Sequence, residues 1–146
     1  MKYQIINNFG RIGLHDSHFS NITFDKNCIA IKVDWGFLEN FEEENILEPI
    51  VFDGAELFFN DVQSQTFKKF TNDNLAHIDF PESLFKNTWL IMTNELVNHA
   101  NVFSMVITMT NDQEYLEWTI EFKSGMFTWG KYILHKNWLN GTETLD

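Results

Sequence analysis

Cysteine is nearly absent from this sequence, and several other features that would narrow its class are missing as well. The single cysteine, Cys28, cannot form an intramolecular disulfide, so nothing indicates an oxidising compartment. The first residues lack the apolar stretch of a signal peptide, and no apolar run approaches the roughly 20 residues that span a bilayer. We therefore expect a cytoplasmic protein with no membrane partner.

Basic residues are also scarce. The chain has 10 Lys and Arg against 21 Asp and Glu, a formal net charge of −11, and Arg11 is the only arginine. Proteins that bind nucleic acid neutralise the phosphate backbone with Lys and Arg. The sequence therefore predicts no nucleic-acid partner.

Helical periodicity is weak, whereas alternation with a period of two is clear. Residues 116–122 place Leu, Trp, Ile and Phe on one face and polar side chains on the other, which is typical of a half-buried strand. Similar patterns predict strands at 103–109 and 88–94. A turn at Ser124-Gly125 followed by a returning strand at 126–135 would complete an antiparallel meander of about four strands.

The first half of the chain begins with a predicted hairpin. Its arms are 19–24 and 28–35, and in the loop 25–27 Asn27 is expected to take the left-handed conformation. Further elements are expected at 49–60, bent at Asp53-Gly54, and in a short helical turn at 81–86.

The predicted fold class is mainly β, an antiparallel twisted sheet, sandwich or open barrel with little helix, in a single domain spanning 1–146. Alternation predicts that Ile29, Ile31, Val33 and Trp35 share one face of a strand. The residues predicted to be buried in the core are Trp118, Ile120, Phe122, Ile31, Val33 and Ile107.

A short polar segment, His15-Asp16-Ser17-His18, is the clearest candidate for chemistry. Imidazole and carboxylate groups ligate transition metals, so a metal-binding protein or hydrolase centred on His15, Asp16 and His18 is the alternative interpretation. Residues three apart on a strand point to opposite faces, however, so a shared site would require a turn. We predict no metal or other cofactor, and expect His15 and Asp16 to form local hydrogen bonds at the start of the first hairpin.

Nucleophilic catalysis has no motif in this chain. There is no Gly-x-Ser-x-Gly elbow, and Cys28 lies within a predicted strand rather than at a helix N-terminus, where its thiol would be activated. The sequence predicts no catalytic residue, and therefore a protein that is not an enzyme.

The stretch from 33 to 67 contains no Lys or Arg. Its acids are Asp34, Glu39, Glu42, Glu43, Glu44, Glu48, Asp53, Glu56 and Asp61. One interpretation is a solvated segment that keeps the protein soluble. The other is a docking surface for a protein with a basic patch, because apolar anchors in an acidic field suit electrostatically steered recognition. The candidate partner-binding residues are Phe37, Glu39, Phe41, Glu42, Glu43 and Glu44.

The N-terminal quarter resembles a group of small uncharacterised bacterial proteins. The residues that carry the resemblance are Gly13-Leu14-His15-Asp16-Ser17, the predicted hairpin at 19–35, and Gly36-Phe37. Members of that group have a Leu-His-Asp segment that leads into antiparallel strands, and some are regarded as immunity proteins of polymorphic toxin systems. The resemblance implies an immunity-like protein that binds another protein, and it implies no catalytic residue.

Overall fold

The structure is a computed structural model, and it describes residues 2–145. Its elements in chain order are β1 (Tyr3–Ile6), η1 (Phe9–Arg11), β2 (Ile12–Gly13), β3 (His18–Asp25), β4 (Cys28–Leu38), η2 (Glu42–Glu44), β5 (Ile50–Asn60), β6 (Ser64–Thr71), β7 (Asn74–Ile78), η3 (Glu82–Phe85), β8 (Trp89–Asn98), β9 (Phe103–Thr110), β10 (Tyr115–Phe122), β11 (Ser124–Trp129), β12 (Tyr132–Leu134) and α1 (His135–Leu139).

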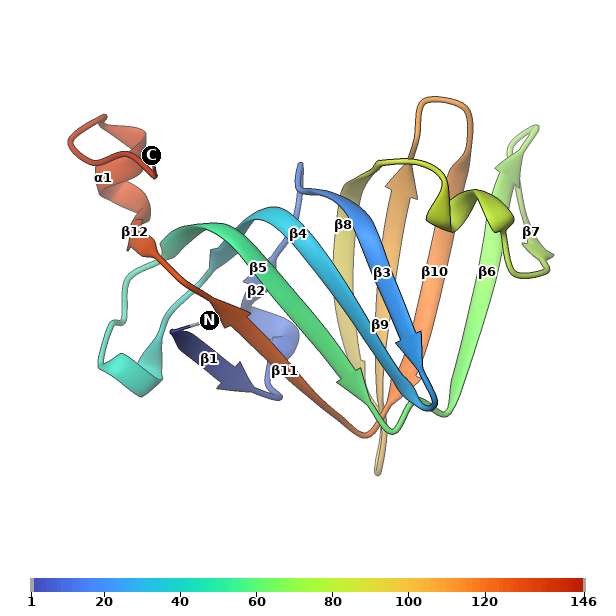
Figure 1. Cartoon of the computed structure of the whole chain (residues 1–146), viewed down its shortest axis with the longest axis horizontal. Helices are drawn as coiled ribbons and strands as arrows, with labels where there is room; N and C mark the ends of the chain where they lie inside the picture. The colour runs from blue at the N-terminus through green and yellow to red at the C-terminus, as the bar shows by residue number, and fades with distance from the viewer. Residues whose placement is uncertain (1, 146) are drawn as a thin grey trace.

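Strands make up about 60% of the chain and helices about 10%, so the predicted mainly β fold is confirmed. The described residues form a 12-stranded antiparallel sheet that is not closed. Its order is β1-β11-β5-β4-β3-β8-β9-β10-β6-β7, with β12 paired to β5 and β2 to β4 (Figure 1). Among residues 2–145, every helix is too short or too polar to cross a membrane.

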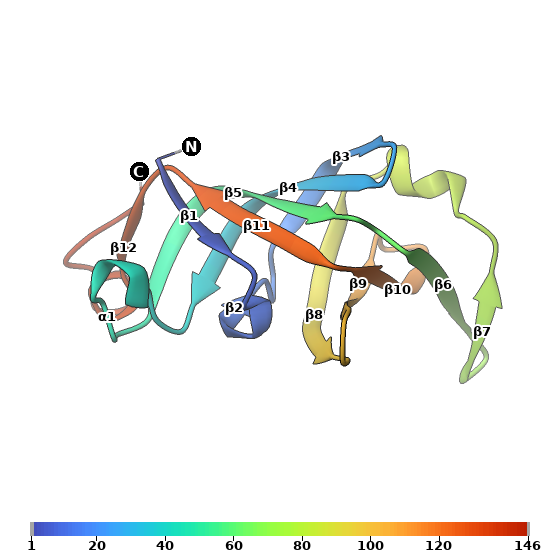
Figure 2. The same cartoon turned by 90° about the horizontal axis from the view of Figure 1, so that it is seen from below.

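Two long chain segments, β5–β6 and β10–β11, bend at the same place, so that one part of the sheet folds against the other. β5 runs into β6 and β10 runs into β11, while β11 pairs with β5 and β10 pairs with β6. Backbone bonds from Gln63 N to Glu121 O (2.8 Å) and from Lys123 N to Asn60 O (3.2 Å) continue the pairing across the bend. Figure 2 shows the result, with β1, β11, β5 and β4 on one side of the molecule and β8 and β9 on the other.

The predicted meander is confirmed for β8, β9 and β10, but its fourth strand is wrong. The segment 126–135 does not return beside β10; β11 pairs instead with β5 and β1, and β12 pairs with β5. A single residue, Lys123, separates β10 from β11, which is too short for a reversal, so the chain continues forward. Gly125 is a packing site rather than a turn, because a Cβ there would lie 2.6 Å from the ring of Phe9.

The core lies between the two sides of the folded sheet, and aromatic rings fill much of it. All six residues predicted to be buried are at most 4% exposed, which confirms that prediction. Phe59 of β5 meets Phe122 of β10 with ring centroids 4.9 Å apart, and Phe19 of β3 meets Trp118 of β10 at 6.5 Å. Contacts between rings from both sides of the fold hold these two sides together.

Trp35 does not share the buried face of β4, contrary to the prediction. Ile29, Ile31 and Val33 are buried, but the next buried residues along the strand are Gly36 and Leu38. The buried face of β4 therefore switches from odd-numbered to even-numbered residues after Val33. β5 changes phase beside it, around Gly54, whose φ of +72° is readily available only to glycine. The expected bend at Asp53-Gly54 is therefore a change of buried face within one continuous strand, and Trp35 is left outside the core.

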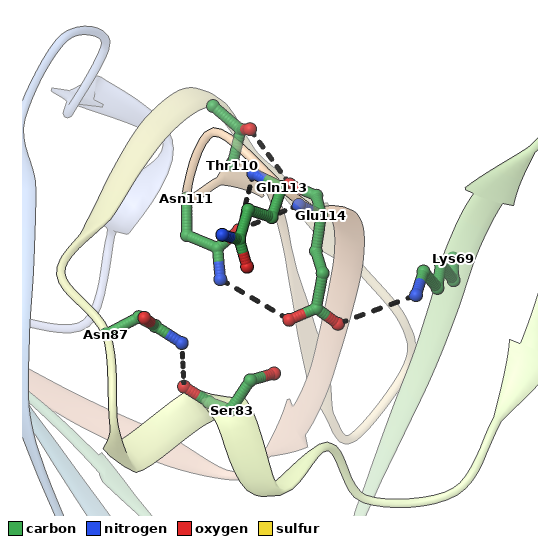
Figure 3. A network of polar contacts seen from close by, with 7 residues as sticks. All are labelled: Lys69, Ser83, Asn87, Thr110, Asn111, Gln113 and Glu114. Atoms are coloured by element: carbon green, nitrogen blue, oxygen red, sulfur yellow. Dashed lines mark hydrogen bonds and ion pairs between the residues drawn. The ribbon is translucent and has the colours of Figure 1, made fainter.

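Two hairpin turns are defined by their backbone conformation and hydrogen bonds. In the β3–β4 hairpin the residue with positive φ is Lys26 (φ 55°) rather than Asn27, so that detail of the prediction is wrong. In the β9–β10 turn, Asn111 Oδ1 accepts hydrogen bonds from the backbone of Gln113 (3.1 Å) and Glu114 (2.7 Å). Figure 3 shows Glu114 reaching from this turn to Asn111 with one carboxylate oxygen and to Lys69 of β6 with the other.

Replacing Trp118 with Ala is expected to lower the free energy of unfolding by about 3–5 kcal/mol. The ring is fully buried and stacks on Phe67 at 5.5 Å, and its Nε1–H donates to Gln65 Oε1 at 3.1 Å. Urea unfolding measures the change. Trp138→Ala is the matched control, because that ring is 40% exposed and should cost about 1 kcal/mol or less. Equal losses in the two variants would contradict the assigned core.

Candidate functional site

The segment Leu14–Ser17 forms a tight turn between β2 and β3. Ser17 N donates to Leu14 O at 2.9 Å, and both of these residues are buried. Asp16 adopts the left-handed conformation (φ 67°), which Asp tolerates better than most residues. His15 and Asp16 therefore stand at the exposed tip of the turn, with side chains 68% and 72% exposed.

Strand β8 holds this turn from the side. Asp16 N donates to Ile91 O (2.9 Å), and Ile91 N donates to Ser17 O (2.8 Å). Asn94 bridges the same region, since its Oδ1 accepts from Leu14 N and its Nδ2 donates to Ile12 O, both at 2.8 Å. Sequence reasoning did not single out Asn94, because nothing in the local pattern of β8 marks a contact about 80 residues away.

The two histidines of the segment contact different carboxylates. His15 Nδ1 lies 2.5 Å from Met92 O, and its Nε2 lies 3.4 Å from Asp16 Oδ2. His18 Nδ1 lies instead 3.3 Å from Asp34 Oδ2, and Asp34 Oδ1 also accepts from His18 N at 2.7 Å. Asp34 was expected only as a member of the acidic stretch, so its pairing with His18 is new.

The structure does not gather His15, Asp16 and His18 into one metal-binding group. Within residues 2–145 no three His, Cys, Asp or Glu side chains are grouped so that they could hold a metal ion. The hydrogen bonds of His15 and Asp16 were expected to be local, but both go to β8, from the His15 ring to Met92 O and from Asp16 N to Ile91 O. The turn joins the first hairpin to the middle of the sheet.

The acidic loop, residues 39–48, lies between β4 and β5. Not all of its candidate binding residues are available to a partner. Phe41 was a candidate binding anchor, but it is 1% exposed, so its prediction as an exposed anchor is wrong. Its ring contacts Trp129 at 5.0 Å and Tyr132 at 5.9 Å, edge to face. A large apolar ring at the base of the loop is held inside because these aromatic neighbours remove it from water.

Backbone hydrogen bonds close the acidic loop above Phe41. Phe41 N donates to Ile46 O (2.8 Å) and Ile46 N to Phe41 O (3.0 Å), while Glu44 N donates to Phe41 O (3.0 Å). Asn45 takes the left-handed conformation (φ 58°) that allows the chain to reverse after η2. The loop is thus an ordered protrusion with defined side-chain positions.

The only arginine of the chain fastens the acidic loop to the core. Arg11 is 7% exposed, and its two terminal nitrogens contact the two carboxylate oxygens of Glu43, one of them at 2.9 Å. Nη1 also donates to Asn40 Oδ1 at 3.1 Å. The hydrogen bond from Arg11 is the main cause that holds the pKa of Glu43 below its ordinary value. Glu43 thus has an intramolecular partner, although its own side chain is 44% exposed.

The remaining candidate residues lie at different places. Glu39, Glu42 and Glu44 are exposed on the acidic loop, so three of the predicted acids share one protrusion. Phe37 is half-buried against His135 of α1, with ring centroids 5.2 Å apart, and does not belong to that loop. The exposed apolar side chain of the loop is Leu47, at 78%, which hydrophobicity alone would have assigned to the core.

Comparison with known proteins adds nothing to these features. No protein-family model matches the chain, and neither a curated protein nor a solved structure matches it. The resemblance to toxin-immunity proteins stays a prediction from the N-terminal residues.

Replacing Glu43 with Gln is expected to lower the free energy of unfolding by about 1 kcal/mol at pH 7, because the buried Arg11 loses its charged partner while solvent screens the exposed carboxylate. A carboxyl whose pKa is lower in the folded state stabilises the fold above its unfolded-state pKa. That contribution is lost as the pH falls through the folded-state pKa.

The difference between the original chain and Glu43→Gln should therefore shrink as urea unfolding is repeated from pH 7 down to about pH 3. Glu42→Gln on the same loop is the control and should change stability by about 0.5 kcal/mol or less. A difference that stays constant with pH would assign the effect of Glu43 to packing rather than charge.

Proposed function

We propose that this chain is a non-enzymatic, cytoplasmic, immunity-like domain that binds another protein through the acidic loop. The observation that carries the proposal is Leu47, an apolar side chain 78% exposed on a loop whose acids Glu42 and Glu44 are also exposed. An apolar contact surrounded by charge of one sign suits a partner with a basic patch and a small apolar depression.

The anchoring of the loop supports this role. Phe41 and the Arg11–Glu43 pair hold it from below, and the backbone bonds between Phe41 and Ile46 close it. A recognition element that is already ordered loses less conformational entropy on binding than a flexible one. The proposed binding residues are thus Glu39, Glu42, Glu44 and Leu47, while Phe41 and Glu43 anchor the loop to the core and to Arg11.

Net charge supports the proposed chemistry of the partner. At −11, the whole chain attracts cationic surfaces over distances of about 8 Å at physiological ionic strength. The exposed acids of the loop would then orient a basic partner toward Leu47 before contact. Polyanions such as nucleic acids would be repelled by the same field.

The purified product of the gene adjacent to this one is the first partner to test. Its association rate constant should fall as salt is raised from about 50 mM to about 300 mM, while the dissociation rate constant changes less. The double reversal Glu42→Lys with Glu44→Lys should lower the association rate further, and Leu47→Ala should act mainly on dissociation. Glu43 is left unchanged because its reversal would disrupt Arg11.

The matched control is the double reversal Asp79→Lys with Glu95→Lys. Both residues are exposed outside the acidic loop, and this variant changes the net charge by the same amount. Surface plasmon resonance gives both rate constants for each variant. The loop would be a feature for solubility only if the association rate constant were unchanged by Glu42→Lys with Glu44→Lys, or if Asp79→Lys with Glu95→Lys lowered it equally.

A further inference from the structure

An aromatic pocket lies on the side of the molecule where Trp35 leaves the core. It is an open pocket of about 310 Å³ lined by Gly13, His15, Asp16, Trp35, Phe37 and Trp138. Strand β4 contributes two of these rings, α1 contributes Trp138, and the turn that follows β2 contributes the polar rim. Segments from both ends and from the first third of the chain therefore meet at one small site.

The walls of the aromatic pocket are rings in partial contact with water. Trp35 and Trp138 have centroids 5.9 Å apart and planes inclined by 45°, so the two indoles diverge instead of stacking flat. Phe37 is held edge to face by His135 at 5.2 Å, and His135 also lies 5.9 Å from Trp138. These ring contacts brace the aromatic side chains that line the pocket.

The electrostatic character of the aromatic pocket favours a cation. Asp16 provides a carboxylate at the rim, and its position is set by the turn and by the bond from its N–H to Ile91 O. None of the six lining residues is Lys or Arg, although His15 Nε2 lies 3.4 Å from Asp16 Oδ2. Lys136 on α1 is paired with Glu48 at 2.8 Å. A carboxylate and two indoles that line the same pocket attract positive charge, the carboxylate directly and the rings through their quadrupoles.

The shortage of hydrogen-bond acceptors decides which cation fits. Asp16 is the only carboxylate among the lining residues, so a primary ammonium group, which carries three N–H donors, would exchange most of its hydrogen bonds to water for contacts with rings. A trimethylammonium group has no N–H, carries its charge on methyl surfaces, and is the type of group that aromatic cages bind. We propose that the aromatic pocket is a binding site for a trimethylammonium group.

The proposal is independent of the proposed function, because it involves none of the residues of the acidic loop. A trimethylammonium group can be supplied by a free small molecule or by a trimethylated lysine side chain of a peptide. The chemistry that the aromatic pocket recognises is the same in both cases. Choline and N-acetyl-trimethyllysine amide are therefore the two probes of the experiment.

Indole N–H signals in nitrogen–proton correlation spectra provide a site-resolved measurement. The chain has 5 Trp, of which Trp89, Trp118 and Trp129 are fully buried. Choline or the trimethyllysine probe should shift the signals of Trp35 and Trp138 in a saturable way and leave the three buried indoles unchanged. Trp35→Leu and Trp138→Leu each delete one signal and so assign it, and the relative affinity of the probes identifies the source.

Three variants test which side chains bind the trimethylammonium group. Trp138→Leu should weaken binding about tenfold, since one ring face is lost. Asp16→Asn should weaken it about threefold or more, and Asn tolerates the left-handed backbone there, so the turn is retained. Tyr115→Leu, which removes a ring 38% exposed beside Phe70, is the matched control and should leave affinity unchanged.

Three results would overturn the proposal. The first is the absence of saturable shifts at Trp35 and Trp138 with both probes. The second is equal binding of 3,3-dimethylbutan-1-ol, the uncharged carbon analogue of choline, which would show a merely apolar pocket. The third is equal weakening by Tyr115→Leu and Trp138→Leu. Circular dichroism of each variant checks that the sheet is retained, and Asp16→Asn keeps the test decisive if a tryptophan variant fails to fold.

Discussion

The continuous pairing of β5–β6 with β10–β11 is the constraint on which the rest of this structure depends. Because both segments pass through the bend together, the sheet can fold over without breaking its ladder of hydrogen bonds. Folding brings Phe59 against Phe122 and Phe19 against Trp118, so the two sides of one sheet share a single core. The core in turn leaves the acidic loop and α1 at the periphery, where both candidate binding features lie.

The change of buried face at Gly54 determines where Trp35 lies. On an uninterrupted alternation Trp35 would follow Val33 into the core. The positive φ of Gly54 and the matching shift in β4 instead expose Trp35 to α1, where it meets Trp138. An aromatic pocket is formed because one strand pair buries one face along half its length and the other face along the remainder.

The acidic loop shows how one ion pair can redistribute roles among neighbouring residues. Arg11 takes up Glu43 and Asn40, and Phe41 enters the core, which leaves Glu42, Glu44 and Leu47 facing solvent. Residues adjacent in sequence thus have different roles: Phe41 and Glu43 anchor the loop, whereas Glu42, Glu44 and Leu47 are left for the proposed contact with a partner. Composition alone treats the acids of such a run as equivalent, whereas the position of a single buried guanidinium distinguishes them.

The sequence by itself determined the fold class, the hairpin, the meander of β8 to β10, and the burial of the six predicted core residues. Period-two alternation is a local property, and each strand records in its own residues which face is buried. Tertiary structure alone decided that β11 pairs with β5, that Trp35 and Phe41 exchange their expected places, and that Asp34 rather than Asp16 pairs with His18. These outcomes depend on contacts between residues distant in sequence, and no local pattern encodes which distant strand or charge will be the neighbour.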